Sequence, residues 1–229
     1  MAVAAEGLGL RYAASIWYLQ IAQGGRDPEL LPLALEGLQR IVEGGEHDDE
    51  LIVAGYLASA DLAALPAGLM AFVDYQAGLD SLRRGERSWA DARFAAIGRQ
   101  SPYAWRVRYV RAVDLVAQRR LDDANTALHA ILDEADDPDR DPLVAPLPVA
   151  LRNDVERALG RIAFERAHWE EALLYYDRVR ARTPTDATLL LEMAWSHFYA
   201  GSTRRALGLL LALDAPIFAE VIAPERFLL

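Results

Sequence analysis

Residues 165–173 read ERAHWEEAL, and residues 199–207 read YAGSTRRAL. Each stretch passes through a polar turn to the pair Ala-Leu, and Ala172 lies 34 residues before Ala206. A fixed period of this length is typical of proteins built from repeated helix pairs. Two helices that cross closely need small side chains at the crossing and large ones beside it. The two copies therefore predict a chain of antiparallel helix pairs.

Small and large residues alternate around these copies as such a crossing requires. In our interpretation, the small residues at the crossings are Gly160, Ala172, Ala194 and Ala206. The large residues that fill the space beside them are then Trp169, Tyr176, Phe198 and Leu210. Farther upstream, Trp89 to Ala92 and Leu121 to Ala124 repeat the spacing of Trp169 to Ala172. We expect clear copies over 153–220 and weaker copies over 73–138.

With these residues the sequence resembles the tetratricopeptide repeat family, whose pattern is W-x2-L-G-x2-Y, then A-x3-F, then P. The first copy matches this pattern at Leu159, Gly160, Ala172, Tyr176 and Pro184. It departs at Glu156, where the family has an aromatic residue, and at Ala163, where it has Tyr. The resemblance implies an all-α fold, a right-handed α-solenoid of antiparallel helix pairs with about 11–12 helices.

Glycines, prolines and short polar turns divide the rest of the chain into helices. We expect one array over 1–229, with divergent helix pairs over 1–136 and an acidic, proline-rich loop over 137–148. The clearest repeat pair follows over 149–229, which ends on the apolar start of a further helix and so indicates a chain cut from a longer protein. The same pattern predicts a first helix over 7–22 and a capping box at Ser88.

Composition limits the classes of partner. The formal net charge is −10, whereas nucleic-acid-binding proteins usually carry a basic face, so we expect no nucleic acid as partner. The chain has no cysteine, which excludes disulfides and thiolate metal sites. It has no apolar run of about 18 residues, so we expect no membrane insertion. Residues 1–10 do not resemble a signal peptide, and both a cytoplasmic and a periplasmic location fit.

The sequence offers little catalytic chemistry. None of the four histidines pairs with another at metal-ligand spacing, and no HExxH motif occurs. Asp137, Asp139 and Asp141 alternate like the first ligands of an EF-hand, but Pro142 stands where the turn glycine belongs. We therefore expect no cofactor, no metal site and no enzymatic activity.

In the tetratricopeptide repeat family, the first helices of each pair line a concave groove that binds peptides or helices of partners. Carried over by register, the groove-facing residues would be Arg157, Arg161, Phe164, Glu165, Leu191, Glu192, Trp195 and Tyr199. Arg157 and Arg161 lie one turn apart and would bind a carboxylate, while Trp195 and Tyr199 would supply an aromatic anchor. The alternative is that these aromatic residues pack against the next helix pair and the arginines pair with Glu156 and Glu165.

The hypothesis that follows is a non-enzymatic scaffold or adaptor that binds a peptide or helix of another protein. The residues predicted to bind this partner are Arg157, Arg161, Glu165, Glu192, Trp195 and Tyr199. A chain rich in Ala, Leu and Arg indicates a GC-rich bacterial genome. A second hypothesis is a structural subunit of a bacterial envelope or motility assembly, in which the array packs permanently and binds no groove ligand. An enzyme on a helical scaffold is the third, and homo-oligomerisation stays open.

Overall fold

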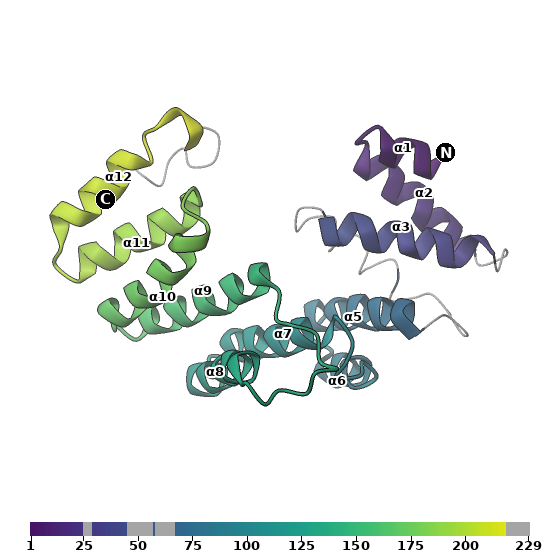
Figure 1. Cartoon of the computed structure of the whole chain (residues 1–229), viewed down its shortest axis with the longest axis horizontal. Coiled ribbons are helices and arrows are strands. Elements are labelled where there is room, and N and C mark those ends of the chain that lie inside the picture. The colour runs from purple at the N-terminus through teal and green to yellow at the C-terminus, as the bar shows by residue number, and fades with distance from the viewer. Residues whose placement is uncertain (25–28, 45–56, 58–66, 219–229) are drawn as a thin grey trace. The chain divides into compact units, whose positions relative to one another are not determined.

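The structure, a computed structural model, describes residues 1–24, 29–44, 57 and 67–218 (Figure 1). Over these residues it contains eleven α-helices, one 3-10 turn and no strand, which confirms the all-α prediction. No helix in this part of the chain combines the length and apolar character needed to cross a membrane. The chain divides into two compact units, Met1–Val107 with Pro142–Ala145, and Arg108–Asp141 with Pro146–Leu229. The solenoid arrangement and the single array stay predictions.

The first unit is built from helices that lie before and after residues 45–66, of which only residue 57 is described. These helices are α1 (Ala2–Gly7), α2 (Arg11–Gly24), α3 (Leu30–Gly44), α5 (Ala67–Arg83) and α6 (Arg87–Ala95). Helix α7 (Ala104–Ala117) begins in this unit and continues into the second. The indole nitrogen of Trp105 donates a hydrogen bond of 2.8 Å to the carbonyl oxygen of Ala145, which attaches the Pro142–Ala145 segment to the first unit.

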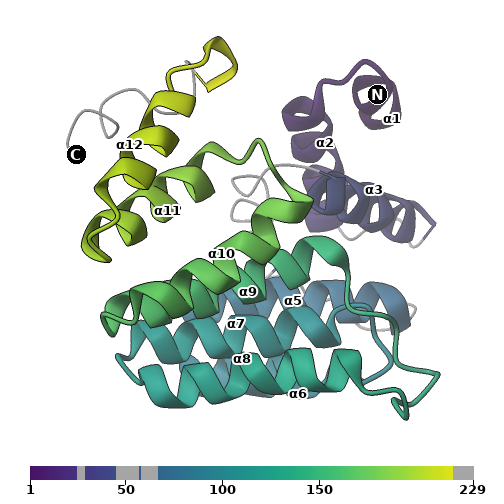
Figure 2. The same cartoon turned by 60° about the vertical axis from the view of Figure 1, so that its left-hand side comes forward.

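The second unit continues as successive helix hairpins. Its further helices are α8 (Leu121–Asp136), α9 (Val149–Glu165), α10 (Trp169–Arg182), α11 (Ala187–Tyr199) and α12 (Thr203–Ala212), followed by the 3-10 turn Pro216–Phe218. Figure 2 shows α9 and α10 side by side as one hairpin, with α11 and α12 forming the next. Between α8 and α9 no helix forms over 137–148, as the proline-rich sequence predicts.

Within the described residues, five hairpins close with the same backbone turn. In each, one residue between the helices takes a positive φ between 61° and 77°, and these residues are Gly9, Gly85, Arg119, Ala167 and Gly201. The amide of the next residue then donates to the carbonyl five positions earlier, as His168 does to Ala163 at 2.9 Å. The turn thus satisfies a carbonyl group that the end of the first helix would leave without a partner.

The side chains around these turns recur as well. Seven residues before the turn residue stands a small residue: Ala2, Gly78, Ala112, Gly160 or Ala194. Five residues after it stands a buried alanine: Ala14, Ala90, Ala124, Ala172 or Ala206. Nine residues after it stands a large side chain: Tyr18, Phe94, Leu128, Tyr176 or Leu210. A Cβ added at Gly160 would lie 2.5 Å from the ring of Tyr176, so only a residue without a side chain fits there.

These positions correct the predicted register of the upstream copies. The alanine of the α5–α6 hairpin that packs in the core is Ala90, whose side chain is 1 % exposed, and not Ala92, which is exposed. Trp89 is 67 % exposed and is therefore not the equivalent of Trp169. With Ala90 in place, the spacing to Ala124 becomes 34 residues, the period found downstream.

Two local predictions were wrong. Residues 7–22 form no single helix, because Gly9 at φ 75° ends one hairpin arm and α2 begins only at Arg11. Ser88 does not cap α6, which begins at Arg87 after Glu86 and has no side-chain hydrogen bond at its cap. The predictions for residues 25–28, 45–56, 58–66 and 219–229, including the C-terminal helix start, lie outside the described residues.

Candidate functional site

The first helices of three successive hairpins, α7, α9 and α11, line a pocket in the second unit with a volume of about 740 Å³. Its apolar walls include Val113, Val116, Ala117, Ala158, Ile162 and Phe164. Five of the six residues predicted to bind a partner line it too: Arg161, Glu165, Glu192, Trp195 and Tyr199. The sixth, Arg157, does not line the pocket but donates hydrogen bonds to Glu192, which does.

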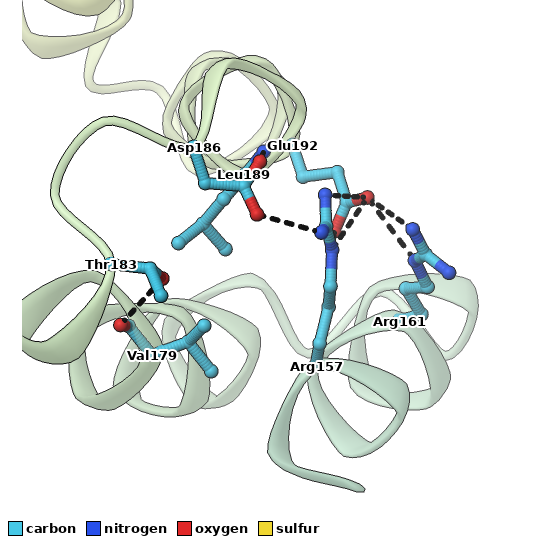
Figure 3. Close-up of polar contacts among 7 residues, drawn as sticks. All are labelled: Arg157, Arg161, Val179, Thr183, Asp186, Leu189 and Glu192. Atoms are coloured by element: carbon cyan, nitrogen blue, oxygen red, sulfur yellow. Dashed lines mark hydrogen bonds and ion pairs between the residues drawn. The ribbon is translucent and has the colours of Figure 1, made fainter. Parts of the chain in front are cut away.

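Glu192 accepts hydrogen bonds from Arg157 and Arg161 of α9 (Figure 3). Arg157 reaches its two carboxylate oxygens from Nε, each at 3.2 Å, and donates from Nη2 to Oε1 at 3.1 Å. Arg161 donates to the same Oε1 from Nε at 3.1 Å and from Nη2 at 2.6 Å. Burial, the largest single effect, lowers the pKa of Arg161, but the hydrogen bonds and the negative charge of Glu192, with smaller effects of Tyr176 and Tyr109, together raise it above the usual value, so this guanidinium stays charged.

Asp186 completes this network and links it to the start of α11. One of its oxygens accepts a hydrogen bond of 3.0 Å from Nη1 of Arg157. The other accepts from the amide of Leu189 at 2.9 Å and so caps the helix (Figure 3). Just before it, the hydroxyl of Thr183 donates to the carbonyl oxygen of Val179 at 3.0 Å, where α10 ends. The network holds two positive and two negative groups, so its charges balance.

The partners of the arginines differ from those that the packing alternative expected. Glu156 instead accepts a hydrogen bond from Arg182, which also donates to Asn153 at 2.6 Å. Leu191, expected in the groove, packs against a core cluster that includes Leu213. Arg157 and Arg161 pair with acidic side chains of the chain itself, and their predicted binding of a partner's carboxylate stays a prediction.

Five aromatic side chains, which we name the aromatic cluster, gather beside the pocket: Phe164, Trp169, Trp195, Phe198 and Tyr199. The ring of Tyr199 stacks on Trp169 with centroids 5.0 Å apart and on Trp195 with centroids 6.0 Å apart. Tyr199 nevertheless remains 52 % exposed. Trp195 and Tyr199 thus pack on each other and also line the pocket, and their role as an aromatic anchor for a partner stays a prediction.

Sequence reasoning missed the contribution of α7 to the pocket. Tyr109, Val113 and Arg119 line it from this helix and its turn. The signal that identifies them is the position of the turn residue, which aligns Arg119 with Ala167 and so aligns α7 with α9. The pKa of Tyr109 is raised to about 12 because the phenol is buried and because of the negative charge of Asp154. At neutral pH this phenol is therefore protonated and can donate a hydrogen bond.

None of the histidines in the described ranges lines the pocket. His168 lies at the N-cap of α10, with its Nδ1 at 3.3 Å from a carboxylate oxygen of Glu171. His129 contacts the hydroxyl of Tyr175 at 3.2 Å. Within the described ranges, no three His, Cys, Asp or Glu side chains are grouped so as to hold a metal ion. No protein-family model and no curated protein matches the sequence.

Proposed function

We propose that the second unit is a tetratricopeptide-like interaction module that binds a short segment of another protein in the pocket between α7, α9 and α11. The observation that carries this proposal is that Tyr199, 52 % exposed, and the partly buried Trp195 of the aromatic cluster line a pocket with apolar walls. Trp and Tyr are the residue types that dominate binding energy at protein interfaces. A segment with a large apolar side chain would gain by burying it against Trp195 and Tyr199.

The composition of the wall supports an apolar ligand over a small polar substrate. Val113 is 41 % exposed although it is apolar, and the partly buried Val116 lies along the same wall. Covering such surface releases about 25 cal/mol for each Å² removed from water. A peptide side chain supplies this cover without any chemistry by the protein, which fits a scaffold.

The charged network supports a preformed binding surface. Glu192 is held by Arg157 and Arg161, and the side chains of Arg157 and Glu192 are less than one fifth exposed. Because these contacts join α9 to α11, two walls of the pocket are fixed before a ligand arrives. A ligand then loses less free energy to ordering of the site.

The proposal is tested by filling the pocket. Ala117 lines it at the exposed end of α7, so Ala117→Trp places an indole in the pocket without disturbing the core. The matched control is Ala130→Trp, an exposed position on α8 that does not line the pocket. Peptides are selected from a random library on the immobilised wild-type chain, and their affinities for both variants are measured by fluorescence polarisation.

We expect selected peptides to carry an aromatic or large aliphatic residue and to lose at least tenfold in affinity for Ala117→Trp, while Ala130→Trp binds like wild type. Peptides that bind all three proteins equally, or a library that yields no binder, would count against the pocket as a binding site. Circular dichroism of each variant shows that the helices are retained.

A second candidate function, a permanently assembled structural subunit, is favoured by a different surface. Leu207 and Leu211 lie one turn apart on α12, and both are exposed. An apolar stripe of this kind is typical of surfaces that another subunit covers. Light scattering after gel filtration tests it: a stable oligomer that the pair Leu207→Glu and Leu211→Glu dissociates would support it, and a monomer would oppose it.

A further inference from the structure

Two charged side chains on the pocket wall make no ion pair within the described part of the chain. They are Arg119, in the turn between α7 and α8, and Glu165, at the end of α9. Both are exposed, and neither the guanidinium nor the carboxylate forms a hydrogen bond to another described residue. The other two charged residues of the wall, Arg161 and Glu192, are bound to each other.

The backbone of Arg119 makes this residue unusual. Its φ of 62° lies in the left-handed region, where three of the five equivalent turns have glycine. An arginine there costs conformational free energy that glycine would not. Ala167 takes the same conformation at φ 61° but is absent from the pocket wall, so it serves as a matched comparison.

The chemistry of these two groups defines a ligand. A guanidinium recognises a carboxylate through paired hydrogen bonds, and a carboxylate recognises an ammonium or guanidinium group. Because the remaining charges of the wall cancel, the pocket presents one free positive and one free negative group. A strongly acidic ligand would be repelled by Glu165 and by the net charge of −10, while Arg119 repels a basic group placed beside its guanidinium and favours an acidic one there.

On the basis of the proposed function, we infer that the ligand is a peptide segment in which one apolar anchor side chain is accompanied by one acidic and one basic side chain. The anchor packs on Trp195 and Tyr199, the acidic side chain pairs with Arg119, and the basic one pairs with Glu165. Both charges are exposed at the wall, so they select among apolar peptides more than they add affinity.

The test uses random-peptide selection on the wild-type chain, followed by affinity measurements of the best peptide with four variants. Arg119→Gly removes the guanidinium and relieves the turn, whereas Ala167→Gly relieves an equivalent turn without a change of charge. Glu165→Gln removes the negative group while keeping its shape. Arg119→Glu is paired with a peptide whose acidic residue is replaced by lysine, so that restored binding reports a direct contact.

We expect the peptides to carry both charges, and the best one to bind Arg119→Gly and Glu165→Gln at least fivefold more weakly but Ala167→Gly unchanged. Arg119→Glu should lose binding to the original peptide and regain it with the lysine peptide. Peptides blocked by Ala117→Trp but indifferent to Arg119→Gly and Glu165→Gln would overturn this inference and leave the proposed function standing. Peptides indifferent to Ala117→Trp as well would overturn both.

Discussion

The guanidinium of Arg157 on α9 lies against the carboxylate of Glu192 on α11, and three hydrogen bonds of 3.1–3.2 Å join them across 35 residues of sequence. Arg161 shares the same carboxylate, and Asp186 binds the far side of Arg157. These contacts give the pocket two walls whose spacing does not depend on a ligand. The stability of the second unit and the shape of its pocket therefore have a common origin.

Removing Glu192 is expected to destabilise the fold because it leaves two arginines without their shared acceptor. We expect Glu192→Ala to lower the free energy of unfolding by roughly 1–3 kcal/mol, measured by urea denaturation. Glu165→Ala is the control: this carboxylate has no partner among the described residues, so its loss should change stability by less than about 0.5 kcal/mol. Equal effects of the two substitutions would contradict the network.

Gly160 and Gly208 are expected to respond oppositely to the same substitution. A Cβ at Gly160 would meet the ring of Tyr176 at 2.5 Å, so Gly160→Ala should cost roughly 1–3 kcal/mol. A Cβ at Gly208 in α12 would meet no atom within 4 Å, so Gly208→Ala should stabilise the helix by about 0.5–1 kcal/mol. Thermal melting of both variants measures the difference, and shifts of the same sign would exclude the crossing at Gly160.

The turn residues supply a prediction about backbone strain. Gly201 has a φ of 74°, so Gly201→Ala should lower the free energy of unfolding by roughly 1 kcal/mol. Ala167 already takes this conformation, so Ala167→Gly should leave stability unchanged or raise it by up to about 1 kcal/mol. Chemical denaturation of the two variants compares them directly. A loss of stability in Ala167→Gly as large as that in Gly201→Ala would show that the turns are not equivalent.

His197 predicts how stability depends on pH. Its pKa is lowered from 6.5 by burial and by Arg205 and Arg180, against a smaller opposite effect of Asp177, and its Nδ1 has no hydrogen-bond partner in the part of the chain that the structure describes. The unfolded chain therefore takes up a proton at higher pH than the folded one. Stability from this residue is complete above about pH 6.5 and falls as the pH drops through that value.

Melting temperatures of the wild type and His197→Gln, measured between pH 8 and pH 5, isolate this contribution. The wild type should lose more stability than the variant as the pH falls, because glutamine takes up no proton. Parallel curves for the two proteins would show that the His197 ring titrates alike in the folded and unfolded states.

Sequence reasoning located the two C-terminal hairpins because small and large residues there recur at a fixed period. It placed the α5–α6 hairpin in the wrong register because Trp89 resembles Trp169 while being mostly exposed, and only burial distinguishes them. The first hairpin was missed because Gly9 forms its turn within a short stretch of sequence, and no run of polar residues there marks where one helix ends and the next begins. In both cases the deciding feature is the left-handed turn residue, which Arg119 and Ala167 show need not be glycine.

The candidate site was predictable in its members but not in their pairing. The resemblance placed Arg161, Glu165, Glu192, Trp195 and Tyr199 in a groove, and all five line the pocket. Glu192 pairs with both Arg157 and Arg161 because of the way α9 packs against α11. The sequence alone favoured Glu156 and Glu165 as partners, because they are nearer along the chain. The contribution of α7 was hidden by the insertion that stretches the spacing between Ala124 and Ala172 to 48 residues.

The central claim is that the pocket between α7, α9 and α11 receives a peptide, and photo-crosslinking tests it most directly. A benzophenone amino acid is placed at Val113 on the pocket wall and, in a matched protein, at Ala130 on the exposed face of α8. A peptide selected on the wild-type chain is added, and crosslinked products are identified by mass spectrometry. We predict crosslinks from position 113 and none from position 130, and crosslinks from position 130 without any from 113 would contradict the claim.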